Sequence, residues 1–193
     1  MTEKQLQNIK KRIKSFKLKL SSEKRRFGQY RDSNGLRYEI ALLYIKIKDY
    51  KNAKKYFQWF EKEFSDDIGF PEFHLAWAVT MFENNDIETT IKKVYAAAFA
   101  NAQIIEFIPN ENLSQIIQAE TFDKDFKESV EFCANIVTPK FKYWIGKFTE
   151  TEEYKNNVKK YISINKLIED EPVGKTRSMM IDEERKFVNS LTR

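Results

Sequence analysis

The residue with the greatest catalytic potential in this chain is its single histidine, His74. Histidine titrates near neutral pH, accepts the proton of serine and cysteine nucleophiles, and is a common metal ligand. His74 has no second histidine to share a metal ion and lies in no Glu-Xaa-Xaa-His pattern. Any nucleophilic mechanism of this type would have to use His74 alone. We therefore expect no catalytic residue and no metal site.

The other groups that could do chemistry have simpler explanations. Cys133 is the only cysteine, so it has no partner for an internal disulfide or a zinc site, and it fits a reducing compartment as a small buried side chain. Residues 174–176, Gly-Lys-Thr, match the end of the phosphate-binding loop motif, but Glu169 occupies the position where that motif requires its first glycine. Asp66 and Asp67 could cap the next helix or bind a cation, without the alternating ligands of a calcium loop. We expect no cofactor.

A basic segment at the N-terminus is the strongest charge feature. Residues 1–31 carry eleven lysines and arginines against two glutamates, whereas the whole chain has a net charge of +5. This asymmetry favours an anionic partner for the segment, or its docking on the rest of the chain. A solvated cationic face, an acidic protein partner, and a nucleic acid or membrane surface all remain open. The expected basic-arm residues are Lys10, Lys11, Arg12, Lys14, Arg25 and Arg26.

The composition favours a folded, all-helical chain. Five glycines and four prolines are too few for the frequent turns of a sandwich or barrel, and the 15% of aromatic residues can bury enough surface to order the chain. No run of about eighteen apolar residues occurs, and the N-terminus has no apolar signal segment. We therefore expect a cytoplasmic protein with no membrane span.

The spacing of apolar residues predicts helices on both sides of the central segment. Leu6, Ile9, Ile13, Phe16 and Leu20 form one stripe, after which Ser21 and Ser22 could cap a second short helix ending near Tyr30. Two further helices, joined by an aspartate-containing turn, are predicted within 112–133. Helices are also predicted over 141–148 and 152–168. Residues 169–177 are expected to form a solvated linker before a final helix that docks through Ile181, Phe187 and Leu191.

Two helices joined by a tight turn are predicted over residues 36–64. In a frame of 34 positions, Ala41 and Ala53 are small enough for close helix contact, and Tyr44 and Phe57 fill the space beside it. With Ile40, these residues resemble the conserved positions of the tetratricopeptide repeat.

The turn of this segment also resembles the same family. Asp49 and Tyr50 match the aspartate and tyrosine of its Gly-Asp-Tyr pattern, and Lys48 replaces the glycine. A second, more divergent copy follows at a shift of 37 residues, over 71–101. Its matching residues are Trp77 and Ala78, Met81, Asp86 and Ile87, Val94 and Ala97, with Thr90 in place of an alanine and Pro71 at the helix start.

The resemblance implies an all-α fold, with TPR-like antiparallel helical hairpins in an α-α superhelix and capping helices at both termini. Two such repeats do not close a core without further helices. We therefore expect residues 1–31 to be a basic N-terminal helical arm or cap, 32–101 to be the two hairpins, and 102–193 to be a C-terminal helical extension that packs on them.

In tetratricopeptide arrays the first helix of each hairpin lines a concave groove. The resemblance assigns this groove to Tyr38, Leu42, Ile45, Leu75, Val79 and Phe82. These side chains are apolar or aromatic, which suits an amphipathic helix better than the C-terminal carboxylate bound by lysine- and asparagine-lined grooves. The alternative is that a terminal helix of the same chain fills the groove.

These features predict an interaction protein rather than an enzyme. The main hypothesis is an adaptor that binds a protein partner through the apolar groove and the basic arm. The alternative is a nucleic-acid-associated helical protein that uses the arm, and a third possibility is an enzyme of unrecognised chemistry. The sequence leaves the partner's identity and the oligomeric state open.

Overall fold

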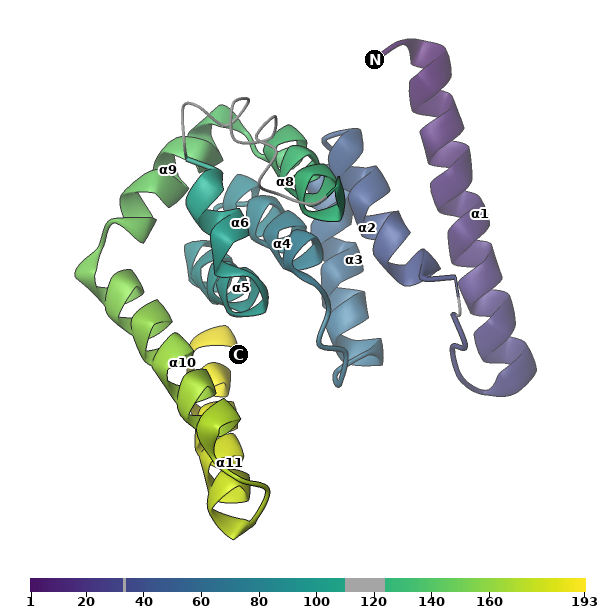
Figure 1. Ribbon diagram of the computed structural model, residues 1–193. Coiled ribbons are helices and arrows are strands. Elements are labelled where there is room, and N and C mark those ends of the chain that lie inside the picture. The colour runs from purple at the N-terminus through teal and green to yellow at the C-terminus, as the bar shows by residue number, and fades with distance from the viewer. Residues whose placement is uncertain (33, 110–123) are drawn as a thin grey trace. The chain divides into compact units, whose positions relative to one another are not determined.

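The computed structural model describes residues 1–32, 34–109 and 124–193, which form ten α-helices and no strand (Figure 1). The predicted all-helical fold is confirmed. The chain forms two compact units, Met1–Ile68 (unit 1) and Gly69–Arg193 (unit 2). The first predicted hairpin lies in unit 1 and the second in unit 2.

Unit 1 begins with a long helix, α1 (Glu3–Phe27). Thr2 caps it, because Thr2 Oγ1 accepts a hydrogen bond from the Gln5 N–H while Gln5 Oε1 accepts one from the Thr2 N–H. The helix ends at Gly28, whose φ of 73° lies in the left-handed region that glycine adopts at little cost. The two ends of α1 are therefore fixed by local sequence.

The predicted helix break at Ser21 and Ser22 is wrong. Both serines are exposed residues inside one continuous helix, and the chain leaves the helix only at Gly28. A serine in a helix interior costs only about 0.5 kcal/mol relative to alanine, and the glutamate, lysine and arginines that follow are good helix formers. A potential cap does not end a helix when the next residues continue it.

The first hairpin consists of α2 (Leu36–Lys46) and α3 (Tyr50–Glu63). Ala41 and Ala53, the two small residues of the predicted helix contact, are fully buried. Helix α1 packs against α2, and its stripe residues Ile9, Ile13 and Leu20 are buried. Unit 1 is thus a three-helix structure in which the N-terminal arm is an integral helix.

The turn of the first hairpin recurs in the second, which consists of α4 (Pro71–Glu83) and α5 (Ile87–Ala100). The Lys48 N–H donates to the Ile45 carbonyl at 2.8 Å, and 37 residues later the Asn85 N–H donates to the Phe82 carbonyl at 2.9 Å. Asp49 and Asp86 then cap the following helices. The same turn therefore occurs twice, at the spacing of the sequence repeat.

Lys48 and Asn85 both have left-handed backbones, with φ of 56° and 58°. We expect Lys48→Gly to raise the free energy of unfolding by about 0.5–1 kcal/mol, because glycine adopts this conformation without the Cβ strain of lysine. Urea unfolding followed by circular dichroism measures the change. The control Lys55→Gly, at an exposed position in the middle of α3, should lower stability by about 1 kcal/mol. Loss of stability in both variants would contradict the assigned turn.

Helix α4 is the central helix of unit 2. Every residue from Phe73 to Met81 is buried except His74, so the helix is covered on all sides. Its neighbours are α5, α8 (Lys124–Ile136) and α9 (Pro139–Thr149), while α6 (Ala102–Phe107) packs against α5 and α8. A helix that is apolar all round needs such enclosure.

The last two helices, α10 (Glu152–Asp170) and α11 (Lys175–Thr192), form a long antiparallel pair (Figure 1). They pack on α5 at one end, where the rings of Phe99 and Tyr161 stack with centroids 4.3 Å apart, and Phe187 lies 6.1 Å from Phe99.

The linker predicted over 169–177 is wrong in extent, because only residues 171–174 separate these two helices. Charged residues occupy exposed helix ends as readily as loops, so composition alone did not place the boundary. The helix predicted at the end of the segment 112–133 corresponds to α8, whereas residues 112–123 lie outside the described part of the chain.

Candidate functional site

In unit 2, the residues assigned to an apolar groove are enclosed. Leu75 and Val79 are fully buried in α4. The ring of Phe82 lies 5.4 Å from the rings of both Phe141 and Trp144 in α9. These contacts favour the alternative in which segments of the same chain cover the first helix of this hairpin.

In unit 1, the three corresponding residues differ in exposure. Ile45 is buried, Leu42 is half-buried, and the half-buried Tyr38 donates its hydroxyl hydrogen bond to the carboxylate of Asp67. Helix α1 packs against α2, which carries all three residues. The first helix of each hairpin is thus in contact with helices outside its own hairpin.

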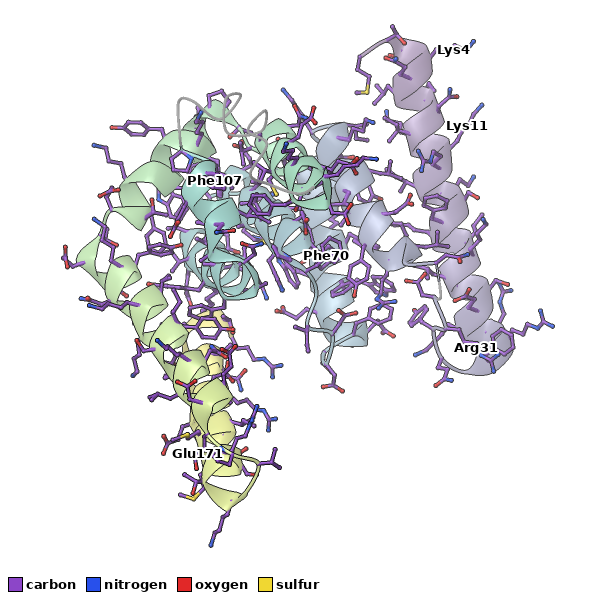
Figure 2. The ribbon with its side chains drawn as sticks, viewed as in Figure 1. Lys4, Lys11, Arg31, Phe70, Phe107 and Glu171 are labelled. Atoms are coloured by element: carbon purple, nitrogen blue, oxygen red, sulfur yellow. The ribbon has the colours of Figure 1, made fainter. Side chains whose placement is uncertain are left out.

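The basic-arm residues differ in the groups that surround them. Arg12 forms an ion pair with Glu39 of α2 at 3.0 Å, with both side chains about half exposed, so the pair contributes little to stability. The guanidinium of Arg26 lies 5.1 Å from the ring of Phe27. Lys11 and Arg25 are exposed, and Figure 2 shows Lys11 projecting from α1.

Lys10 and Lys14, in contrast, line a groove on the surface of unit 1. Two adjoining hollows, with volumes of about 350 and 530 Å³, share Lys17, Ser21 and Asn52, and we call them together the lysine-lined groove. Its lysines are Lys10, Lys14 and Lys17 of α1 and Lys55 of α3. Its other lining residues are Ile13, Leu18, Leu20, Ser21, Tyr30, Tyr44, Ile47, Asp49, Asn52, Tyr56 and Trp59.

The charge of the groove is predominantly positive. Among its described lining residues the only acidic side chain is Asp49, and this carboxylate accepts hydrogen bonds from the backbone N–H and the side-chain amide of Asn52. The ammonium group of Lys17 lies 5.1 Å from the ring centre of Tyr44 and 5.5 Å from that of Tyr56. Such cation–π contacts hold a lysine in place without neutralising it.

An aromatic cluster forms one end of the groove. Trp59 lies 5.0 Å from Tyr56 and 5.6 Å from both Tyr30 and Phe64, measured between ring centres. Burial, followed by the charge of Glu63, raises the pKa of the Tyr30 phenol. Burial also raises the pKa of Tyr56, whose hydroxyl donates to the Arg37 carbonyl at 2.8 Å. These phenols therefore stay neutral and add no negative charge to the groove.

A network of charged residues holds the connection between α1 and α2. The carboxylate of Asp32 accepts hydrogen bonds from the N–H groups of Leu36 and Arg37, at 2.7 and 3.0 Å. The Arg37 guanidinium then bridges Asp32 and Asp67, at 3.0 and 2.9 Å. Burial lowers the pKa of Arg37, but its hydrogen bonds to Asp67 and Tyr38 outweigh this and raise it overall.

This network corrects the helix-cap expectation for Asp67. The N-cap of α4 is Phe70, without a side-chain hydrogen bond. The pairing of Asp32 with Arg37 was not predicted from the sequence. A sequence signal was present, because an aspartate shortly before a helix commonly binds the free N–H groups of the first turn.

The remaining candidates for chemistry lie inside the structure. Cys133 is buried, and burial, followed by the charge of Glu72, raises the pKa of its thiol. The imidazole of His74 lies close to Gly69, where an added Cβ would be 2.9 Å from Nε2. Across the described residues, no group of three or more potential ligands could hold a metal ion. In the same part of the chain, no helix is long and apolar enough to cross a membrane.

Comparison with known proteins adds no assignment. No protein-family model matches the chain, and searches of curated proteins and of solved structures found no match either. The chemistry of the lysine-lined groove is therefore the basis for a functional conclusion.

Proposed function

We propose that the protein is a non-catalytic binding module that holds an acidic, amphipathic segment of a partner protein in the lysine-lined groove of unit 1. The observation that carries this proposal is the combination of four lysines with apolar and aromatic side chains along one surface. Lysine rims attract carboxylates, and an apolar floor binds the apolar face of a helix. The basic arm thus acts as one wall of a binding site.

The lysine spacing suits a helical partner. One face of α1 carries Lys10, Lys14 and Lys17. Measured along the helix axis, Lys14 lies about 6 Å from Lys10, and Lys17 lies about 10 Å from Lys10. An acidic helix lying along α1 presents glutamates at i, i+4 and i+7 with the same spacing. The exposed Leu18 and the half-buried Ile47 are also among the lining residues and offer contacts to the apolar side of such a helix.

The aromatic residues favour a protein over a nucleic acid. Binding to single strands uses ring faces that are free for base stacking. Here Lys17 lies over Tyr44 and Tyr56, and the ring of Trp59 packs among Tyr30, Tyr56 and Phe64. The rings therefore form an apolar end of the groove rather than a row of stacking surfaces.

Fluorescence anisotropy with a labelled 20-residue helical peptide, glutamate on one face and leucine on the other, tests this proposal. We expect Lys14→Glu to weaken binding about tenfold, because it replaces an attraction with a repulsion. Lys11→Glu is the matched control, since it makes the same charge change at an exposed position outside the groove. Its effect should be no more than about twofold.

The contrary outcomes are distinct. Equal losses in Lys14→Glu and Lys11→Glu would indicate attraction by the general positive charge of α1, and not a groove. A 20-nucleotide single-stranded RNA that binds more tightly than the peptide, with the same sensitivity to Lys14→Glu, would instead support the nucleic-acid alternative. A control peptide in which every glutamate is replaced by lysine should not bind.

A further inference from the structure

The α10–α11 pair has an unusual distribution of burial. Its outer part, residues 162–182, which we call the distal hairpin, extends beyond the end that packs on α5 (Figure 1). Between Lys159 and Leu191 no residue is buried. Large apolar side chains are nevertheless strongly exposed there: Ile162 by 54%, Leu167 by 58%, Val173 by 93% and Met179 by 57%.

This exposure is unfavourable for an isolated pair of helices. Two helices bury only the seam between them, and helices in water are stabilised mainly by packing an apolar face. The half-buried Ile164 and Ile168 are separated by one helical turn, and Ile162 and Leu167 lie outside that stripe. Strongly exposed large apolar side chains that gather on one pair of helices commonly mark an interaction site.

We propose that the distal hairpin is a self-association surface, through which two copies of this chain pair with their α10 helices antiparallel. The inference concerns unit 2 and is independent of the function proposed for unit 1. The charges along α10 select the occupant. Lys159 and Lys160 lie near its middle, whereas Glu169, Asp170 and Glu171 lie at its distal end, which Glu171 marks in Figure 2.

An antiparallel copy brings these opposite charges together. In a two-fold pairing centred between residues 164 and 165, Lys159 faces Asp170 of the second copy, while Ile162 and Leu167 each approach their own counterparts in that copy. Helical periodicity places Lys159, Ser163, Lys166 and Asp170 along one line of the helix, with Ile162 and Leu167 on either side. A parallel arrangement would place like charges opposite each other, so the pattern is self-complementary in one direction only.

Sedimentation equilibrium of the full chain tests the pairing. The wild-type protein is expected to dimerise in the micromolar range. Leu167→Glu combined with Ile162→Glu should raise the dissociation constant about a hundredfold or more, because each change removes apolar contacts twice in a symmetric dimer. The matched control is Tyr143→Glu, which changes another strongly exposed large side chain, on α9, and should leave the constant within about twofold.

A charge exchange tests the direction of pairing. Lys159→Glu and Asp170→Lys should each weaken the dimer about fivefold, and the two together should restore it, because the opposite charges meet again with their positions exchanged. Circular dichroism should show unchanged helix content in every variant. A wild-type protein that stays monomeric up to about 200 μM overturns the proposal. A double variant that dimerises no better than the two single variants overturns the antiparallel pairing.

Discussion

Replacing Phe141 with alanine is expected to lower the free energy of unfolding of unit 2 by about 3–5 kcal/mol. The Phe141 side chain is fully buried, and its ring lies 5.4 Å from that of Phe82 and 5.7 Å from that of Trp144. Truncation removes these contacts and leaves a cavity that the surrounding helices fill only in part. Urea unfolding followed by circular dichroism measures the loss.

Tyr143→Ala is the matched control for this change. Tyr143 is on the same helix and is also aromatic, but it is 71% exposed. Its truncation should change stability by no more than about 0.5 kcal/mol. Similar effects of the two substitutions would contradict the packing of α9 on α4. A large effect of Phe141→Ala alone would show that the C-terminal extension is part of the structural core around Phe82.

The hairpins could be predicted because their signals are local. Asp49 and Asp86 supply caps, Ala41 and Ala53 mark a close helix contact, and both turns repeat at a shift of 37 residues. Each of these features depends on residues within one or two helical turns. A single sequence can therefore reveal them without knowledge of the tertiary structure.

Other features depend on which segments meet, and the sequence did not reveal them. The lysines of α1 were recognised as a basic arm, but Lys55 and Trp59 of α3 belong to the same groove only because the chain brings α3 beside α1. The spacing of Lys10, Lys14 and Lys17 was a usable signal, since it defines one helix face. The division into units 1 and 2 falls in the loop between the two hairpins, and the loop residues alone do not show that the hairpins belong to separate units.

The connection between α1 and α2 is the second position where a single change should have a large effect. We expect Asp32→Ala to lower the free energy of unfolding of unit 1 by about 2–4 kcal/mol. The Asp32 carboxylate is 1% exposed and binds the N–H groups of Leu36 and Arg37 as well as the Arg37 guanidinium. Its removal leaves two N–H groups of α2 without this acceptor, and the largely buried Arg37 cation keeps only one of its two carboxylate partners, Asp67.

Two matched variants separate this network from a simple loss of charge. Asp32→Asn should cost less than Asp32→Ala, because the amide oxygen can still accept one backbone hydrogen bond and asparagine tolerates the positive φ of 27° at this position. Asp66→Ala removes the same charge from an exposed loop residue and should change stability by no more than about 0.5 kcal/mol.

Because residues 28–35 join α1 to α2, Asp32→Ala should also weaken peptide binding in the lysine-lined groove, whereas Asp66→Ala should not. Equal stability and equal peptide affinity of Asp32→Ala and Asp66→Ala would show that the network neither supports unit 1 nor positions α1 as a wall of the groove.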